Sequence, residues 1–212
     1  MPTSAPHKPN SGGGFMQWRY LDIRTITDEE YDKWYAMADD ARRAKCDAFR
    51  QQEDRLCAIA GDHLARMGIA AHCGVDPADI RFARTEAGKP YAIGLDVHFN
   101  ISHSGNFVVC AVSERPIGID VEQLRPIRGK LTQKVCTPEE LAYIQEAPGW
   151  GEELTGESMR RFFRVWTTKE AYFKWTGTGI TDLKAFDTLD HISNGGTSEL
   201  DGHMVRIFET KC

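Results

Sequence analysis

Residues 117–122 read Ile-Gly-Ile-Asp-Val-Glu, an alternation that is typical of a β-strand. Residues two apart in a strand share a face, so the three branched apolar side chains are predicted to face a core. The other face carries Gly118, Asp120 and Glu122, with the Cα atoms of the two acids about 7 Å apart. Because glycine has no side chain, Gly118 leaves room beside the acids for a bulky group.

The two carboxylates of this strand favour a hard cation. Carboxylates on one face repel each other unless water or a shared cation lies between them. No His or Cys accompanies them in the strand, and oxygen ligands alone are typical of Mg²⁺. An isolated pair of this kind is most often a solvated sheet edge, so the interpretation depends on a second cluster.

That second cluster lies in residues 162–175, which are strongly helical in pattern. Trp166, Glu170 and Lys174 are spaced four apart and therefore form one stripe on a helix. A Glu followed four residues later by Lys is ordinarily an exposed pair, but most of this helix is apolar, and buried charges need partners. We therefore predict that Glu170 completes a metal site with the two acids of the strand, and that Lys174 contacts a phosphate.

Basic side chains elsewhere have the chemistry to hold a polyphosphate. Arg42 and Lys45 are three apart in a helical stretch and share a face. Lys89 lies in a Gly-Lys-Pro turn, and His103 lies between two serines at the end of a predicted strand. Each also has an ordinary explanation, namely a solvated helix face, a common loop and a hydrogen-bonded histidine, so none is decisive alone.

Composition and missing motifs exclude several functional classes. A formal net charge of -5 argues against general binding to nucleic acids or anionic membranes. The chain lacks the motifs of P-loop enzymes, Rossmann domains and serine hydrolases (G-x-x-x-x-G-K-[ST], G-x-G-x-x-G and G-x-S-x-G). Six cysteines without a CxxC pair, no signal peptide and no apolar run of about 20 residues predict a reduced, cytoplasmic protein.

The order of predicted elements indicates an α+β fold, because strands and helices mix without a regular βαβ alternation. Residues 1–15 are interpreted as a disordered extension or a tag, since they are rich in Pro, Gly and Ser. The rest of the pattern predicts strands over 17–26, 99–101, 107–113, 117–122 and 204–210, and helices over 27–68, 138–147 and 159–176.

Together these residues resemble the 4'-phosphopantetheinyl transferase superfamily, in its larger, pseudo-dimeric Sfp type that activates peptide and polyketide synthases. The matching segments follow the order of the family: ARRAKCDAF (41–49), EDR (53–55), GKP (88–90), FNISHSG (99–105), GIDVE (118–122) and WTTKEAYFKWTGTGI (166–180). The last two segments form its most specific combination.

The resemblance implies two similar α/β subdomains with pseudo-twofold symmetry, residues 16–116 and 117–212, and an active site in the cleft between them. It implies that Mg²⁺, or Mn²⁺, and the substrate coenzyme A bind there. The implied metal ligands are Asp120, Glu122 and Glu170. The implied contacts of coenzyme A are His103 and Lys174 at the diphosphate, Arg42, Lys45 and Arg55 at the 3'-phosphate, and Lys89, Pro90 and Ser102 near the adenine.

The implied reaction moves 4'-phosphopantetheine from coenzyme A to a serine of an acyl or peptidyl carrier protein. The serine hydroxyl attacks the β-phosphate, and 3',5'-ADP leaves. Catalysis is expected to come from positioning and charge stabilisation. Lys174 is expected at the developing charge, and either Glu170 or a water on the metal accepts the serine proton.

The carrier protein and its pathway are left open by the sequence. Carrier proteins are commonly acidic around the modified serine, and a basic segment follows the acids of the strand. Its residues are interpreted either as a docking patch or as an ordinary solvated loop. They are Arg125, Arg128, Lys130 and Lys134. The chain is expected to act as a monomer, without nucleic-acid or membrane partners.

Two departures from the family pattern matter. Many relatives carry an arginine for the 3'-phosphate two positions after Arg55, where this chain has Cys57. The loss of one charged hydrogen bond weakens binding on the order of ten- to a hundredfold unless other cations compensate. Relatives also continue past the last predicted strand, so the C-terminal sheet is expected to lack a strand or to be completed by another element.

Three other functions share parts of this pattern. A magnesium-dependent hydrolase of nucleotide diphosphates would use the same carboxylates without a carrier protein. A non-catalytic coenzyme A-binding module would bind the ligand without transferring it. An interaction domain with incidental acids would show no dependence on Mg²⁺.

Overall fold

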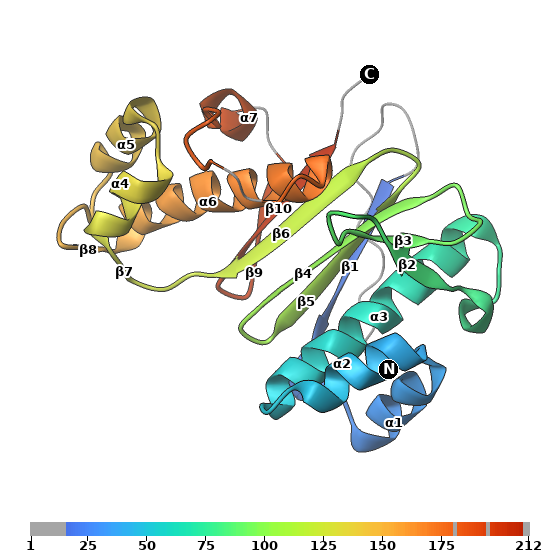
Figure 1. The fold of residues 1–212 in the computed structure, drawn as a ribbon. Helices are drawn as coiled ribbons and strands as arrows, with labels where there is room; N and C mark the ends of the chain where they lie inside the picture. The colour runs from blue at the N-terminus through green and yellow to red at the C-terminus, as the bar shows by residue number, and fades with distance from the viewer. Residues whose placement is uncertain (1–15, 180–181, 194–195, 210–212) are drawn as a thin grey trace.

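The computed structural model describes residues 16–179, 182–193 and 196–209. These residues form two lobes, each with a three-stranded antiparallel sheet and one long helix (Figure 1). The predicted extension or tag at residues 1–15 lies outside the described residues. The mixture of helices and sheets confirms the α+β class.

The N-terminal lobe is built on a sheet covered by a long helix. Its elements are β1 (Met16–Asp22), α1 (Asp28–Met37), α2 (Asp40–Ala48), α3 (Gln52–Cys73), β2 (Phe82–Arg84), β3 (Pro90–Ala92), β4 (His98–Ser104) and β5 (Phe107–Ser113), with 3₁₀ turns at Ile23–Thr25 and Pro77–Asp79. The sheet order is β1-β5-β4, and α3 packs across it. The β2–β3 hairpin forms a separate small sheet.

The C-terminal lobe has a second sheet with a long helix packed on it. Its elements are β6 (Ile117–Gln123), β7 (Ile127–Arg128), α4 (Thr132–Val135), α5 (Pro138–Gln145), β8 (Glu153–Leu154), α6 (Gly156–Thr176), α7 (Leu189–Ser193), β9 (Thr197–Leu200) and β10 (His203–Glu209), with a 3₁₀ turn at Gly129–Leu131. The sheet order is β6-β10-β9, and α6 packs on β6 and β10.

The two lobes share one connectivity. In each lobe a first strand leads to a long helix, and the helix is followed by an antiparallel hairpin whose second strand pairs with the first strand. Thus β1, α3, β4 and β5 correspond in order to β6, α6, β9 and β10. The pseudo-twofold relation between the lobes and the boundary at residues 116 and 117 stay predictions that this recurrence supports.

A shared core joins the two sheets. It contains Trp18 of β1, Val109 and Ala111 of β5, and the apolar residues of β6. Ile117 and Ile119 are fully buried, as the alternation of the strand predicts. Because this cluster draws side chains from both lobes, it holds β4 and β6 close to each other in the middle of the molecule.

The predicted helix over residues 27–68 is in fact three helices, α1, α2 and α3, and side-chain caps begin the first two of them. Thr27 and Glu30 form a capping box that starts α1. The carboxylate of Asp39 accepts a hydrogen bond from the backbone N–H of Arg42 and starts α2. The predicted strand over 17–26 likewise ends at Asp22, whose side chain caps the following 3₁₀ turn.

Gly118 allows α6 to approach β6 at backbone distance. A Cβ atom at this position would lie 2.0 Å from the carbonyl oxygen of Ala171, which is far closer than any real contact. The room that glycine was predicted to leave is therefore filled by the helix that carries Glu170 and Lys174. The missing side chain lets α6 pack closely on β6 and places these two residues beside the acids of that strand.

The opposite side of α6 is anchored by a buried ion pair. Lys169 lies next to Glu170 in sequence, and its Nζ is 2.9 Å from Glu140 of α5, with both side chains fully buried. Lys169 also donates to the carbonyl oxygens of Leu183 and Phe186. Because every charge is paired, this cluster ties α6 to α5 and to the loop that follows α6.

Candidate active site

Polar side chains join β4 and β6 where the two lobes meet. Ser102 Oγ donates to Asp120 Oδ1 at 2.9 Å, and Ser104 Oγ donates to Glu122 Oε2 at 3.0 Å. Asn100 Oδ1 accepts a backbone N–H of β6 at 2.9 Å. These positions alternate along β4, so the same face of the strand supplies all three contacts. We call Asn100, Ser102, Ser104, Asp120 and Glu122 the seam.

Asp120 is the most buried acid of the seam, with 3% of its surface exposed. Lys174 Nζ donates to its Oδ1 at 2.6 Å. Burial raises the pKa of Asp120, while the charge of Lys174 and the hydrogen bonds from Lys174 and Ser102 oppose that rise. Oδ2 is buried and has no hydrogen-bond partner among the described residues. The carboxylate therefore has one oxygen still able to accept a ligand.

Glu122 and Glu170 complete a group of three acids around this point. Trp166 Nε1 donates to Glu122 Oε1 at 2.9 Å, which gives the tryptophan at the head of the predicted stripe a defined role. Burial raises the pKa of Glu170 to about 7, and the charges of Asp120 and Glu122 add to that rise. The three carboxylates thus share one electrostatic environment, with Lys174 as the nearby cation.

The chemistry of this group suits a hard cation. Its donors are carboxylate oxygens, and one buried oxygen of Asp120 lacks a partner within the described ranges. In the ligand-free structure Lys174 supplies the positive charge at Asp120. No set of three or more His, Cys, Asp or Glu side chains in the described part is already arranged as a metal site. The metal ligands Asp120, Glu122 and Glu170 therefore stay a prediction that the donor set supports.

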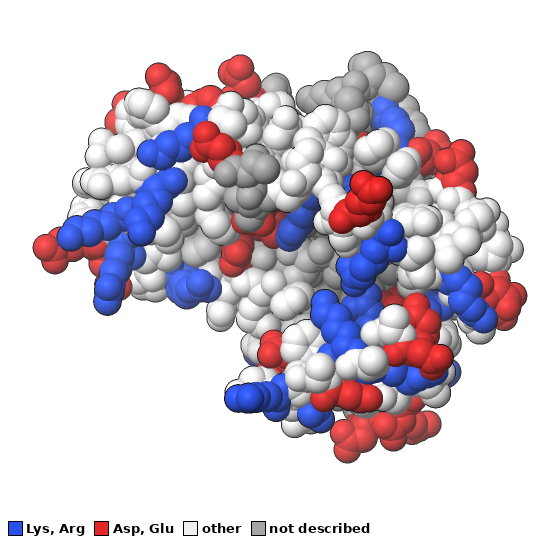
Figure 2. All heavy atoms as spheres, viewed as in Figure 1, with Lys and Arg blue, Asp and Glu red and all other residues white. Residues whose placement is uncertain are grey.

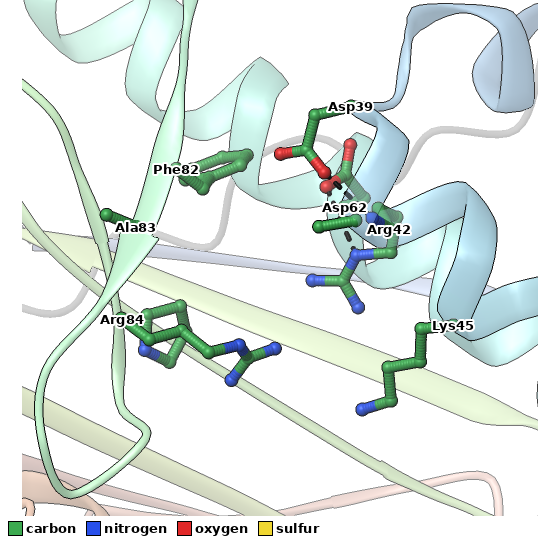
Figure 3. A pocket seen from close by; sticks show the side chains of 9 residues that line it. Asp39, Arg42, Lys45, Asp62, Phe82, Ala83 and Arg84 are labelled. Carbon is green, nitrogen blue, oxygen red and sulfur yellow. Dashed lines mark hydrogen bonds and ion pairs between the residues drawn. The ribbon is translucent and has the colours of Figure 1, made fainter.

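A second charged region lies in the N-terminal lobe, between α2 and the β2–β3 hairpin. It is a pocket of about 310 Å³, lined by Asp39, Ala41, Arg42, Lys45, Asp62, Phe82, Ala83, Arg84 and Pro90. Figure 3 shows Arg42, Lys45 and Arg84 converging on its interior. Asp62 lies 3.4 Å from Arg42 Nε and holds that guanidinium at the wall. Burial lowers the pKa of Lys45, and the charges of Arg42 and Arg84 lower it further.

Arg84 is the pocket residue that sequence reasoning missed. It lies on β2, and its Nη1 donates to the carbonyl oxygen of Gly88 at 2.7 Å. Its position four residues before the Gly-Lys-Pro turn is a signal that it shares a hairpin with that turn. Three cations therefore surround the pocket, whereas the sequence pattern predicted two from α2.

Cys57 lies in the hydrophobic core of the N-terminal lobe. Only 5% of its surface is exposed, and burial raises the pKa of its thiol to about 11. Arg55 Nε donates to the carbonyl oxygen of Phe49 at 2.9 Å, and Arg55 is not among the residues that line the pocket. Its predicted contact with a 3'-phosphate stays untested, and Arg84 offers the pocket a cation from a different element.

His103 lies between the two charged regions. Burial lowers its pKa, and the positive charges of Lys174 and Lys45 lower it further. The charges of one lysine from each region therefore act on His103, which follows Ser102 on β4. An extended ligand with several phosphates would meet cations at both ends and this histidine in between.

The remaining predicted contacts divide between different places. Pro90 lines the pocket. Ser102 donates to Asp120 and accepts a hydrogen bond from Lys174 at 2.8 Å, so its hydroxyl belongs to the seam. Lys89 Nζ donates to carbonyl oxygens at the C-terminal end of α6. Contacts of these three residues with an adenine stay predictions.

The predicted docking residues lie on the C-terminal lobe, beyond the end of β6. Arg125, Arg128, Lys130 and Lys134 are all exposed. Leu131, in the same segment, is 41% exposed. Figure 2 shows Lys and Arg side chains gathered over this lobe, and acidic and basic side chains together in the hollow between the lobes.

In the part of the chain that the structure describes, no helix has the length and apolar character needed to cross a membrane.

Comparison with known proteins gives matches over almost the whole described chain. A family model described as the 4'-phosphopantetheinyl transferase superfamily matches residues 116–207, and one described as the 4'-phosphopantetheinyl transferase N-terminal region matches residues 25–115. The chain is 33% identical over 187 residues to 4'-phosphopantetheinyl transferase Sfp of Bacillus subtilis (strain 168), across 87% of this chain and 80% of that protein.

Two further relatives carry the same description. A 4'-phosphopantetheinyl transferase of Bacillus subtilis is 36% identical over 163 residues, across 76% of this chain and 70% of that protein. The 4'-phosphopantetheinyl transferase HetI of a Nostoc strain is 34% identical over 151 residues, across 68% of this chain and 61% of that protein.

Proposed function

The chain belongs to the 4'-phosphopantetheinyl transferase superfamily, and we propose how its two charged regions divide the reaction between them. It is a transferase that moves 4'-phosphopantetheine from coenzyme A to a serine of a carrier protein. The hydrolase and the non-catalytic binding module are not favoured by its relatives. The observation that carries the site assignment is the contact of Lys174 and Ser102 with the buried Asp120, next to Glu122 and within the electrostatic influence of Glu170.

Coenzyme A lies across both lobes in this proposal. The 3'-phosphate enters the pocket, where three cations, Arg42, Lys45 and Arg84, outnumber the two acids that also line it. A phosphate matches the forked donors of arginine, and lysine adds a point charge. From the pocket the diphosphate extends past His103 toward the seam.

The seam holds the reacting end of the substrate. Asp120, Glu122 and Glu170 would hold Mg²⁺ or Mn²⁺, because hard cations prefer oxygen ligands. When bound, the ion neutralises negative charge on the diphosphate. Lys174 leaves Oδ1 of Asp120 and donates to a phosphate oxygen, where it stabilises charge that develops on the leaving 3',5'-ADP.

Glu170 accepts the proton of the carrier serine in this proposal. Burial and the neighbouring acids raise its pKa to about 7, which makes this carboxylate a stronger base, whereas a metal ion bound to it would lower the pKa again. The serine oxygen then attacks the β-phosphate, and the bond to the leaving phosphate breaks. A water that Glu170 orients is an equally consistent acceptor, and both routes require this carboxylate.

The carrier protein docks, in this proposal, on the exposed basic segment after β6. Arg125, Arg128, Lys130 and Lys134 would attract the acidic surface around its serine, and Leu131 offers an apolar contact among them. We further propose a monomer that acts in a reducing compartment such as the cytoplasm, in keeping with the free cysteines of the described chain.

Mass spectrometry of an apo-carrier protein tests the reaction and the site together. Incubation with coenzyme A, Mg²⁺ and this protein should add one phosphopantetheine to the carrier. Glu170→Gln should abolish that gain, whereas Glu29→Gln, at an exposed position of α1, should not. Release of 3',5'-ADP from coenzyme A without a carrier would favour the hydrolase, and binding without any mass gain would favour the non-catalytic module.

A further inference from the structure

Lys89 belongs to the N-terminal lobe, yet its ammonium group binds the C-terminal lobe. The residue lies in the turn between β2 and β3. Its Nζ donates to the carbonyl oxygens of Lys174 at 2.6 Å and Trp175 at 3.0 Å, and to that of Ile117 at 3.4 Å. One side chain therefore connects the hairpin to both α6 and β6.

A cation stabilises a helix most at its C-terminal end. The last carbonyl groups of a helix have no partner within it, and they carry the negative end of its dipole. In α6 the cap is Gly177, in the left-handed conformation with φ 72°, and its N–H bonds only to Phe173 O. Lys89 supplies the donors for two carbonyls of this last turn. An ammonium has three N–H groups, and all three have acceptors here.

The turn that carries Lys89 is itself well defined. The carbonyl oxygen of Lys89 accepts from Thr85 N at 2.9 Å, and its N–H donates to Thr85 Oγ1 at 3.1 Å. Next to it, the carbonyl oxygen of Gly88 accepts from Arg84 of the pocket. The hairpin thus presents the pocket on one side and the contact with α6 on the other.

We propose that Lys89 is a positioning residue that fixes the end of α6 across the lobe interface, and thereby holds Lys174 and Glu170 at the seam. It acts through the backbone of α6 and does not bind a phosphate through its amino group. This inference rests on the proposed function, because it concerns the residues assigned to catalysis there. It also replaces the expected adenine or phosphate contact of the Lys89 side chain with a different role.

Lys89→Met tests this role, because it keeps most of the side-chain length and removes the charge. We expect kcat for carrier modification to fall on the order of ten- to a hundredfold, since small misplacement of reacting groups has large effects. The Kd of coenzyme A, measured by calorimetry with Mg²⁺, should stay within about twofold. Amide hydrogen exchange should become faster over residues 172–177. Lys33→Met, at an exposed position of α1, is the matched control for both measurements.

Two further variants keep the test decisive. Lys89→Arg, which keeps the charge and the donors, should restore a large part of kcat and of the exchange protection. Lys89→Gln, a shorter neutral donor, replaces Lys89→Met if that variant fails to fold, with the same expected split between kcat and Kd.

Several outcomes would overturn the inference. A rise in the Kd of coenzyme A with unchanged kcat would make Lys89 a ligand contact. A lower melting temperature with unchanged kcat per folded molecule would make it a purely structural residue. Wild-type behaviour in all measurements would remove any role. If the wild-type protein modifies no carrier, the proposed function fails, while exchange at the end of α6 and coenzyme A binding still test the contact.

Discussion

The pocket and the seam contain opposite arrangements of charge. In the pocket, Arg42, Lys45 and Arg84 repel one another, and the two acids that line it, Asp39 and Asp62, offset them in part. At the seam the acids predominate: Asp120 is bonded to Lys174 and Ser102, and the charges of Asp120 and Glu122 raise the pKa of Glu170. The pocket therefore carries an excess of positive charge, whereas the seam pairs its buried acid with a lysine of α6. The pocket can therefore take up an anion directly, whereas Asp120 must exchange Lys174 for another partner before it binds a metal ion.

The largest effect should follow from a change to the centre of the seam. Asp120→Asn removes the charge that Lys174 and the proposed metal share, so carrier modification should fall on the order of a thousandfold or more. The Kd of coenzyme A should change only a few fold, because the pocket is intact. Ser102→Ala, which removes one hydrogen bond to the same carboxylate, should cost far less, about tenfold. Equal losses from both variants would contradict the central role of the carboxylate.

The next effect concerns the pocket. Arg84→Ala should raise the Kd of coenzyme A about ten- to a hundredfold and leave kcat nearly unchanged, because a charged hydrogen bond to the substrate is lost outside the reacting groups. Titration calorimetry at two salt concentrations measures the Kd of coenzyme A. Arg81→Ala, an exposed residue near the same hairpin, is the control. If Arg84→Ala weakens the binding of coenzyme A without its 3'-phosphate as much as the binding of coenzyme A itself, the pocket does not bind the 3'-phosphate.

If Lys174 and a metal ion compete for Asp120, removal of Lys174 should strengthen metal binding rather than weaken it. Lys174→Met removes the cation that occupies Asp120, so Mn²⁺ should bind more tightly, about several fold to tenfold, in the absence of coenzyme A. Electron paramagnetic resonance of free Mn²⁺ measures this affinity without any assay of activity. Weaker binding of Mn²⁺ to the variant would show that Lys174 does not compete with the ion.

The smallest effect is on stability. Burial and neighbouring acids raise the pKa of Glu170 from 4.5 to about 7, so the folded chain keeps a proton that the unfolded chain releases. The contribution of this group to the free energy of unfolding should therefore fall as pH rises from about 4.5 to 7. Glu170→Gln should remove a dependence of about 1–2 kcal/mol, after allowance for partial solvent exposure. Denaturant unfolding without metal at pH 5 and pH 8 measures it, and identical pH profiles for both proteins would contradict it.

The sequence predicted the seam better than it predicted the pocket. Side chains alternate strictly along a strand, so the sequence places Asp120 and Glu122 on one face of β6. Residues four apart share one side of a helix, so it places Glu170 and Lys174 on one side of α6. The pocket is formed by elements far apart in sequence, and nothing local relates Arg84 to α2. Its third cation could therefore be found only in three dimensions.

Contacts made by the backbone were also beyond the reach of the sequence. Lys89 was considered as a phosphate contact because lysine side chains commonly bind phosphate, but here its acceptors are main-chain carbonyls. The break between α1 and α2 was missed for a related reason: apolar periodicity continues through it, and only the cap formed by Asp39 ends one helix and begins the next.

The neighbouring residues Lys169 and Glu170 have a consequence for mutational scanning. Lys169 anchors α6 in a fully buried ion pair, while Glu170 lies at the seam. A screen that reads protein abundance should find Lys169 intolerant and Glu170 permissive. A screen that reads product should find both intolerant. Positions of α6 that tolerate substitution in the abundance screen but not in the product screen should therefore lie on one side of the helix. They would identify the functional face of α6 without any bound ligand.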